Sequence, residues 1–390
     1  MIAQEYKLYK SNKTRHLDKM FEEACFVWNH ALALQKRYYK IFGKYVPENK
    51  MQKHFEKRIQ RNLLHSDTVI ELLQRLDAAY SRFFNHTSKR TPKFKKNKDF
   101  SSIVFKRSGG YSLNGNIFTV YKIGKKFKFW LSRDYNGKIK RLVVKRNRVG
   151  EFYIIVIIDK PSSSIGKSHN GASVGIDFGL KTYMTLSDGT KIKNPQFLKN
   201  ELQKLRIKSH KLSKSKESSN NRKRKRVELA KAYDNISSRR NDFQWKLAHE
   251  LCRKYDKIFV EDLNLTGMCK CWGRKMQDLA HADFVSKLEH VAKKYGVIVH
   301  KIDRFYPSSK TCTCGYVNKE LKLSERKWVC PDCGTLHDRD VLAAENILRR
   351  GIYELESDGK TLKHFSKRQS RLHPTISKES MPRKQKILTI

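Results

Sequence analysis

The sequence contains no run of 18 apolar residues, and its first ten residues, MIAQEYKLYK, lack the apolar core of a signal peptide. The first absence argues against a transmembrane helix, and the second argues against secretion. Cysteine is also scarce, at 8 of 390 residues, and four of the eight fall between positions 312 and 333. Such clustering fits metal ligands in a reducing compartment better than a disulfide framework. We therefore expect a cytoplasmic protein with no membrane partner.

Acidic residues are few for a chain of this length. Asp and Glu total 38 against 84 Lys and Arg, which gives a formal net charge of +46. A charge of this size opposes folding and solubility unless a polyanion neutralises it. Basic residues run along nearly the whole chain with aromatic residues, 11% of the total, between them. This distribution predicts a nucleic-acid partner rather than a single membrane patch, and the length allows two or three domains.

The first 160 residues are predicted to combine strands with a helical insertion. Residues 1–10 suit a short strand, and residues 15–87 carry apolar residues at helical spacing. Residues 101–159 alternate apolar and polar positions between Gly and Asn turns, which indicates several strands. If the first strand joins these, residues 1–160 form a β-barrel with an inserted bundle. The helical positions expected to be buried are Phe21, Cys25, Trp28, Leu32, Leu34, Val69, Leu73, Leu76, Ala79 and Tyr80.

Two segments concentrate positive charge. Residues 89–100 place six Lys or Arg around two Phe, and the turn of a helical hairpin expected over 196–254 carries five consecutive basic residues. Either run could be an ordinary solvated face, but nucleic-acid contact is the interpretation we favour. The candidate contact residues are Lys93, Lys95, Lys96, Arg222, Lys223, Arg224, Lys225 and Arg226.

The stretch VGIDFGLKTYMTLSDG, residues 174–189, is the centre of the second half. As a strand it places Val174, Ile176 and Phe178 on one face, and Asp177 between two glycines on the other. Glycines beside a carboxylate let a bulky charged ligand approach the backbone. The order of strand, strand, strand, helices, strand, helix and strand that begins here predicts an RNase H-like α/β sheet.

Two further acidic stretches follow in the chain. Residues 257–262, KIFVED, end a strand with Glu261, and residues 337–347, HDRDVLAAENI, begin a helix with Asp338 and Asp340. Three carboxylates that come from two strands and a helix start are the ligands that a two-metal phosphodiester site requires. Its ions lie roughly 3.5–4 Å apart and bind hard anionic oxygens. At this point either aspartate of the third stretch could serve.

The clustered cysteines predict one structural zinc site. Cys330 and Cys333 have the C-P-x-C-G form of a zinc knuckle, whereas Cys312 and Cys314 are separated by a single residue. The alternative is a set of free buried thiols. Cys269 and Cys271 also form a C-x-C pair, but no partner motif lies near them, and we interpret them as incidental.

Taken together, these motifs resemble the TnpB family, transposon-encoded RNA-guided nucleases related to compact type V CRISPR effectors. GIDFGLKTYMTLSDG resembles the first RuvC motif and FVEDLNLTGM the second, and the cysteine stretch that runs into DRDVLAAENI resembles the zinc ribbon and the third motif. The resemblance covers about residues 1–350. It implies that Asp177, Glu261 and Asp340 are the catalytic acids. The third motif is usually D-R-D-x-N-A-A-x-N, so Leu342 is a departure, as is the shortened first knuckle.

The resemblance also implies a domain plan. It predicts an α/β RNase H-like (RuvC) nuclease domain with an inserted zinc ribbon, together with an N-terminal wedge-like β-barrel that carries a helical bundle. The expected boundaries are 1–14 and 97–160 for the barrel, 15–96 for the recognition bundle, 161–171 for a linker, 172–306 and 336–351 for the nuclease domain, 307–335 for the ribbon, and 352–390 for a disordered basic tail.

The function implied is RNA-guided cleavage of double-stranded DNA next to a short adjacent motif. The expected cofactors are two Mg²⁺ ions at the acids and one structural Zn²⁺, and the expected partners are a guide RNA and target DNA. The protein would act as a monomer in the ribonucleoprotein, in a prokaryotic cytoplasm and on the nucleoid when bound to its target. Two alternatives stay open, a nuclease-inactive RNA-guided repressor of the same fold and a transposase that carries out strand transfer itself.

Overall fold

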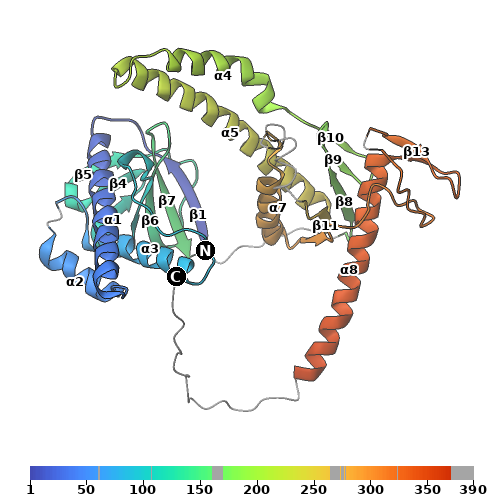
Figure 1. Cartoon of the computed structure of the whole chain (residues 1–390), viewed down its shortest axis with the longest axis horizontal. Coiled ribbons are helices and arrows are strands. Elements are labelled where there is room, and N and C mark those ends of the chain that lie inside the picture. Colours follow the sequence, from blue (N-terminus) through green and yellow to red (C-terminus); the bar gives the residue numbers. More distant parts are fainter. Residues whose placement is uncertain are drawn as a thin grey trace. The chain divides into compact units, whose positions relative to one another are not determined.

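The structure is a computed structural model that describes residues 1–59, 62–106, 108–159, 170–263, 273, 276, 278–322 and 324–369, with side chains of the last helix up to residue 357. The chain divides into two compact units, residues 1–163 with 204–235 and residues 164–203 with 236–390 (Figure 1). Most of the predicted linker, residues 161–169, lies outside the described residues. No described helix combines the length and the apolar character needed to cross a membrane.

Two antiparallel sheets form the framework of the first unit. Their strand orders are β1-β7-β6-β2 and β3-β4-β5. The strands are β1 (Ile2–Lys7), β2 (Ser102–Phe105), β3 (Tyr111–Asn114), β4 (Ile117–Val120), β5 (Lys125–Lys128), β6 (Lys138–Arg146) and β7 (Phe152–Asp159). Along β7 the buried residues are Phe152, Ile154, Val156 and Ile158, which is the period of two expected for a sheet with one face on the core.

The two sheets are joined at the end of β1. Leu8 forms an antiparallel bridge with Phe129, so the first strand does enter the sheet structure as expected. The predicted barrel is nevertheless not closed, because the described strands β2 and β3 do not pair with each other. The 3-10 helix η2 (Ser108–Gly110) connects them instead, and the ring of His65 fills the space beside Gly110.

The helical insertion lies between β1 and β2 in the sequence and packs onto the same core. It comprises α1 (Thr14–Phe42), α2 (Glu48–Arg58) and α3 (Ser66–Phe84). The 3-10 helices η1 (Asn97–Asp99) and η3 (Tyr121–Ile123) also lie in this part of the chain. The predicted helical positions are confirmed as core positions. Eight of them are buried, and Leu34 and Ala79 pack against the core while partly exposed.

The second unit contains a five-stranded mixed sheet with the order β10-β9-β8-β11-β12. Its strands are β8 (Ser173–Phe178), β9 (Thr182–Leu186), β10 (Lys191–Lys193), β11 (Lys257–Glu261) and β12 (Ile298–Ile302). The first three pair antiparallel, whereas β11 is parallel to both β8 and β12. The predicted order of three strands, helices, strand, helix and strand is therefore confirmed.

Helices cover both faces of this sheet (Figure 1). On one face, Val174 and Ile176 share a core with residues of α5 (Asn220–Lys254) and α7 (His281–Tyr295). On the other face lies α8 (Arg339–Gln369), and its approach depends on Gly175 of β8. A Cβ atom there would lie 2.1 Å from the carbonyl oxygen of Ala344 and 2.6 Å from the amide nitrogen of Leu348. The glycine that flanks Asp177 thus admits a helix backbone rather than a ligand.

The expected hairpin over 196–254 is present as α4 (Phe197–Ser213) and α5, joined by residues 214–219. The prediction that the basic run Arg222–Arg226 lies in this turn is wrong. The run lies in the first turns of α5. Asn220 and Asn221 already belong to the helix, because the turn ends at Ser219, whose hydroxyl accepts a hydrogen bond from the amide of Arg222.

The prediction of a disordered tail from residue 352 is wrong for its first part, because α8 continues to Gln369. Ile352 and Leu355 pack against a small core formed by Phe259, Ile302 and Ile347. Glu354 also accepts a hydrogen bond from Arg350 at 2.6 Å and lies 3.0 Å from the His300 ring nitrogen on β12. These tertiary contacts, which local composition does not reveal, hold the helix onto the sheet. Residues 370–390 lie outside the described residues.

Candidate active site and cysteine cluster

The three predicted acids come from three elements of the second unit. Asp177 is on β8, Glu261 is the last residue of β11, and Asp340 is in the first turn of α8. Parallel pairing sets Ile176 opposite Val260, so the residues that follow, Asp177 and Glu261, are neighbours at the carboxyl ends of the two strands. Because α8 packs across β8, its first turn brings Asp340 to the same end of the sheet. Asp177 therefore lies close enough to Glu261 and Asp340 for their charges to act on it. Among the described residues, only the four cysteines of the ribbon have metal-ligating atoms all within 4.8 Å of one another, so the acids are neighbours without forming so tight a group.

Their closeness has an electrostatic consequence. The pKa of Asp177 is raised to about 7, first by burial and then by the charges of Asp340 and Glu261, while Arg339 and Arg326 oppose the rise. The pKa of Glu261 is also raised, by burial and by the neighbouring Asp262. Carboxylates that share a desolvated site resist ionisation, so this group of acids calls for a bound cation.

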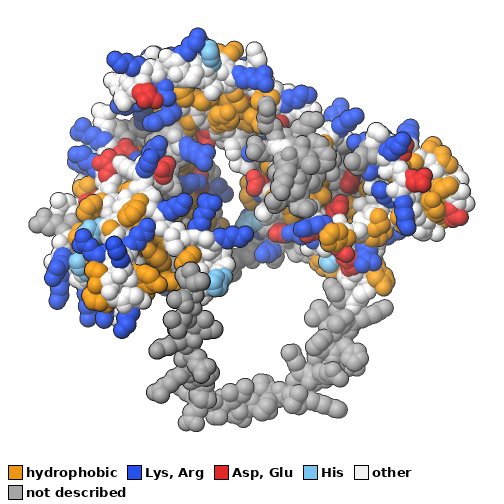
Figure 2. All heavy atoms as spheres, viewed as in Figure 1, with side chains coloured by type: hydrophobic (Ala, Val, Ile, Leu, Met, Phe, Trp, Pro, Cys, Tyr) orange, Lys and Arg blue, Asp and Glu red, His pale blue; other side chains and the backbone are white. Residues whose placement is uncertain are grey.

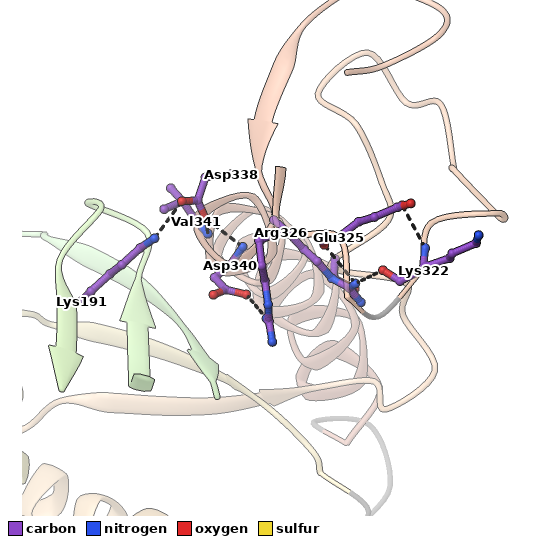
Figure 3. Close-up of polar contacts among 9 residues, drawn as sticks. Lys191, Lys322, Glu325, Arg326, Asp338, Asp340 and Val341 are labelled. Atoms are coloured by element: carbon purple, nitrogen blue, oxygen red, sulfur yellow. Dashed lines mark hydrogen bonds and ion pairs between the residues drawn. The ribbon is translucent and has the colours of Figure 1, made fainter. Parts of the chain in front are cut away.

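Asp338 and Asp340 have different surroundings (Figure 3). Asp338 points toward Lys191 of β10, at 2.7 Å, and accepts hydrogen bonds from the amides of Asp340 and Val341. Burial alone would raise the pKa of Asp338, but the Lys191 ion pair and these amide bonds lower it. Asp338 therefore acts as the cap of α8. This engagement favours Asp340, and not Asp338, as the third acid of the site.

Asp340 points toward Arg326, whose guanidinium lies 2.9 Å from its carboxylate (Figure 3). Arg326 directly precedes β13 (Lys327–Val329), which pairs with β14 (Leu336–Asp338), and β14 continues without a break into α8. The ribbon hairpin thus supplies a cation to the acid site. Sequence reasoning missed Arg326, because nothing in its local pattern separates it from the other basic residues around it.

The side chain of Leu342, the departure from the family motif, is part of a small core next to the cysteines. It is 2% exposed and packs with Cys312, Leu321, Trp328 and Cys330. Position 342 faces the ribbon core and not the acids. The buried Asn346 serves the same junction, since its amide donates to the carbonyl oxygens of Ser308 and Thr311 at 2.8 and 2.6 Å.

The sulfur atoms of Cys312, Cys314, Cys330 and Cys333 all lie within 4.8 Å of one another. Two of the separations are 3.5 and 3.7 Å. Four sulfurs bonded tetrahedrally at the usual Zn–S distance would be ~3.8 Å apart, so the cluster fits a zinc ion. The Nε2 atom of His337 lies 3.0 Å from the Cys312 sulfur on the edge of the cluster. Cys269 and Cys271 lie outside the described residues.

The shortened knuckle has a backbone pattern similar to that of the standard one. The Cys312 amide donates to Tyr316 and the Gly315 amide to Cys312, just as the Cys330 amide donates to Thr335 and the Gly334 amide to Cys330. Both glycines have positive φ, +97° and +71°. A left-handed glycine therefore closes each turn, and the missing residue shortens the first turn without removing a sulfur from the cluster.

The basic candidates in the first unit differ from one another. Trp28 Nε1 donates to the carbonyl oxygen of Lys93, which fixes this segment on α1. The ammonium of Lys95 lies 3.9 Å from the Trp28 ring centroid, and burial lowers its pKa. Lys93 and Lys96 have exposed side chains. Lys95 is exposed as well, but its ammonium already makes a cation–π contact with Trp28, so Lys93 and Lys96 are the better candidates for contact with a partner.

The basic run of α5 also divides into two groups. Arg222 donates to the carbonyl oxygens of Leu212 and Ser215 at the end of α4, and Lys225 donates to that of Lys211. These two residues cap the helix that precedes them. Lys223, Arg224 and Arg226 are exposed at the start of α5, where the helix dipole disfavours positive charge. Their position therefore favours an anionic partner.

Comparison with protein-family models gives three matches. A model described as "Probable transposase" (OrfB_IS605) matches residues 158–271, and a "Cas12f1-like, TNB domain" model matches residues 281–347. A "Helix-turn-helix domain" model of the same family matches residues 4–44, where the structure has one strand followed by the single helix α1. Among solved structures, the Cas12f1–sgRNA–target DNA complex is similar in fold, with a TM-score of 0.55 and 17% identity over 86% of this chain and 83% of that one.

Individual relatives cover most of the chain. A Streptomyces pristinaespiralis protein named "Putative RNA-guided DNA endonuclease" is 31% identical over 90% of this chain and 89% of its own length. Escherichia coli InsQ, with the same description, is 27% identical over 85% of this chain and 88% of its own. The "TnpB-like protein L79" of Acanthamoeba polyphaga mimivirus is 30% identical over 49% of this chain. The chain belongs to the TnpB (OrfB_IS605) family.

Proposed function

We propose that this protein is an RNA-guided endonuclease that cuts double-stranded DNA with two metal ions held by Asp177, Glu261 and Asp340. The observation that carries this proposal is the convergence of the three carboxylates at one end of the sheet, with the pKa of Asp177 raised to about 7. Acids that raise one another's pKa values are stabilised when a divalent cation binds among them, so such a site is suited to metal ions. The names of the long relatives supply the substrate class.

The donor set fits Mg²⁺, because all three ligands are hard carboxylate oxygens. Bound there, a pair of Mg²⁺ ions would supply activation of a water and stabilisation of the leaving oxygen. Glu261 and Asp177 would hold the metals from the strand ends, and Asp340 would hold them from the helix. Arg326, now paired with Asp340, would be free to turn toward a phosphate oxygen once a cation occupied the site.

The RNA partner is proposed from charge and from the relatives' names. Lys and Arg side chains are spread over most of the described surface seen in Figure 2, and acidic ones are fewer. Lys93 and Lys96 of the first unit, with Lys223, Arg224 and Arg226 of α5, are the exposed candidates for phosphate contacts. Residues 1–160 would then recognise the adjacent motif and guide, and base pairing would read the remaining target sequence.

The ribbon, residues 307–335, would hold one structural Zn²⁺ through Cys312, Cys314, Cys330 and Cys333. Metal analysis of the purified protein should give about one equivalent of zinc, and a Cys330→Ser variant should give less. The matched control is Cys252→Ser, which changes a buried cysteine outside the cluster. Equal zinc in the wild type and Cys330→Ser would mean that the metal is bound elsewhere.

The decisive experiment identifies RNA and cleavage together. The protein is co-expressed with the end of its own element, the bound RNA is sequenced, and plasmids with a matching target beside a randomised segment are incubated with Mg²⁺ or EDTA. We expect a discrete RNA with a variable 3′ end, and linear plasmid only with a matching target and Mg²⁺. Tight binding without cutting would support the repressor alternative, and joined strand-transfer products would support the transposase. Cutting without RNA would contradict the proposal.

A further inference from the structure

Two aromatic side chains of the first unit are stacked on each other while facing solvent. The rings of Tyr9 and Trp130 have centroids 6.0 Å apart and an interplanar angle of 27°. Tyr9 is 49% exposed and Trp130 is 63% exposed, and the following residue, Leu131, is 38% exposed. A tryptophan this exposed gains little from folding, so its place on the surface points to a partner.

The backbone holds this aromatic pair in place. Tyr9 N donates to the carbonyl oxygen of Lys128 at 2.9 Å, and Trp130 N donates to that of Lys7 at 2.8 Å. Between these two bonds, Leu8 and Phe129 form the bridge that joins the two sheets, and both are buried, at 4% and 0% exposure. Because side chains alternate along a strand, Tyr9 and Trp130 must face outward. The pair is a rigid surface feature.

The charge around the pair favours a polyanion. Residues 121–133, which lead up to and pass Trp130, contain five Lys or Arg and no acid, and the first acid that follows is Asp134. Lys10 follows Tyr9 directly, and Lys7 pairs with the carboxylate of Glu151 at 2.8 Å. A protein partner would have to match this charge with acids, whereas nucleic acid supplies phosphates beside every base.

We propose that Tyr9 and Trp130 form a stacking platform for an unpaired nucleobase of the guide RNA, with the surrounding lysines on the flanking phosphates. The inference rests on the proposed RNA-guided function. An unpaired base offers an open π face, while a base inside a duplex has both faces covered by its neighbours, so a single-stranded segment is the fitting ligand. Stacking accepts any base, so the platform would fix the path of the RNA rather than read its sequence.

The test separates stacking from charge. Binding of a labelled 20-nucleotide oligo(U) is measured over a range of salt concentrations for the wild type, Trp130→Ala, Trp130→Phe and Lys128→Gln. Trp130→Ala should bind about 5- to 100-fold more weakly at every salt concentration, because the lost stacking is not electrostatic. Trp130→Phe should recover most of the affinity. Lys128→Gln should instead flatten the slope of log affinity against log salt by about 0.7.

Fluorescence gives a second readout. Oligo(U) should quench tryptophan emission of the wild type and of Lys128→Gln, and most of this quenching should disappear in Trp130→Phe. Wild-type affinity of Trp130→Ala would overturn the platform. If Trp130→Ala lost affinity only for a 20-base-pair DNA duplex, and not for oligo(U), the platform would be overturned in favour of a duplex contact. A lower molar mass of Trp130→Ala in light scattering would overturn it in favour of contact between copies of the chain. If wild-type protein carries no RNA and binds no oligo(U), the proposed function fails instead.

Discussion

The acid site and the start of α5 both gather like charges, but they do so in opposite surroundings. At the end of the sheet, three half-buried carboxylates are neighbours, and burial together with the charges of the other two acids raises the pKa of Asp177 to about 7. At the start of α5, five basic residues lie in succession, three of them exposed and two bonded to carbonyl oxygens at the end of α4. Burial makes the first group dependent on a specific cation, whereas water and salt can screen the second.

The difference teaches that the number of like charges is a poor guide to how strongly a site needs its partner. Three neighbouring half-buried acids carry an electrostatic penalty until metal binds, whereas the basic run, three of whose five residues are exposed, carries a smaller one that solvent screens. The acid site should therefore respond to single substitutions with all-or-none effects. The basic run should respond in proportion to the number of residues changed.

The largest expected effect is the loss of cleavage on replacing an acid. Asp177→Ala, Glu261→Ala and Asp340→Ala should each slow cutting about a thousand-fold or more, because several kcal/mol of metal-assisted stabilisation is lost. RNA content should not change. Cleavage rates with enzyme in excess, together with RNA retention on the purified protein, check this prediction.

The control for that experiment is Asp338→Ala. It removes the cap of α8 and should lower stability by about 1 kcal/mol while leaving measurable cutting. The opposite pattern, robust cutting by Asp340→Ala and none by Asp338→Ala, would exchange the two roles.

The second expected effect is a change in how stability depends on pH. Between pH 4 and 7 the folded, metal-free protein keeps a proton on Asp177 that the unfolded chain releases, so stability falls as the pH rises through this range. Asp177→Asn should reduce this slope, leaving the contribution of Glu261, and should melt at a higher temperature than the wild type at pH 8. The free energies of unfolding of Asp177→Asn and the wild type at pH 8 would differ by at most about 4 kcal/mol, because the pKa of Asp177 is raised by roughly three units on folding. Thermal melts from pH 5 to 8 in EDTA measure it.

Adding Mg²⁺ should affect the wild type and Asp177→Asn differently, because the metal binds the deprotonated carboxylate. It should raise the melting temperature of the wild type more at pH 8 than at pH 6 and have little effect on Asp177→Asn. Glu320→Gln, which changes an exposed carboxylate of the ribbon, serves as the control and should behave as the wild type does. Equal pH slopes for Asp177→Asn and the wild type would show that Asp177 does not titrate in this range.

The third effect concerns the exposed half of the basic run. Replacing Lys223, Arg224 and Arg226 together by Gln should flatten the slope of log RNA affinity against log salt by about 2, at about 0.7 for each phosphate contact. Cleavage should fall only as far as RNA loading falls. Filter binding at several salt concentrations tests this, and an unchanged slope would mean that these three residues form only a solvated face.

The smallest effect is expected for Arg222→Gln, which serves as the matched charge control. Because Arg222 donates to the carbonyl oxygens of Leu212 and Ser215, its loss should loosen the hairpin turn by about 1 kcal/mol. Hydrogen exchange at the end of α4 should accelerate, while the salt slope changes by less than in the triple variant. A large slope change with no change in exchange would place Arg222 on the RNA rather than on α4.

Much of the second unit could be predicted from local patterns. Alternation placed Asp177 on a strand, the end of KIFVE placed Glu261 at a strand terminus, and helical spacing after residue 338 placed Asp340 at a helix start. Parallel strands bring their carboxyl ends to one edge, so the meeting of the first two acids follows from the predicted sheet. The choice between Asp338 and Asp340 required the family resemblance, and the Lys191 contact of Asp338 now gives a physical reason for it.

What could not be predicted depends on contacts between distant residues. Lys95 has the same local pattern as Lys93 and Lys96, yet the ring of Trp28 holds its ammonium. The extension of α8 beyond residue 351 depends on packing against β11 and β12. The sequence shows Leu342 only as a departure from the motif, and its role in the ribbon core depends on packing with residues 312–330. In each case at least one deciding neighbour is more than 15 positions away, which no local window contains.

The passage from β14 into α8 limits how the length of this chain can vary. Four consecutive residues have four different tasks: His337 lies against the Cys312 sulfur, Asp338 caps the helix, Arg339 donates to the carbonyl oxygen of Lys322, and Asp340 faces the acid site. One inserted or deleted residue would turn the helix start by about 100° and misalign them all. Natural variation in length should therefore spare this passage, and shortened or grafted versions of the protein should keep residues 333–340 intact.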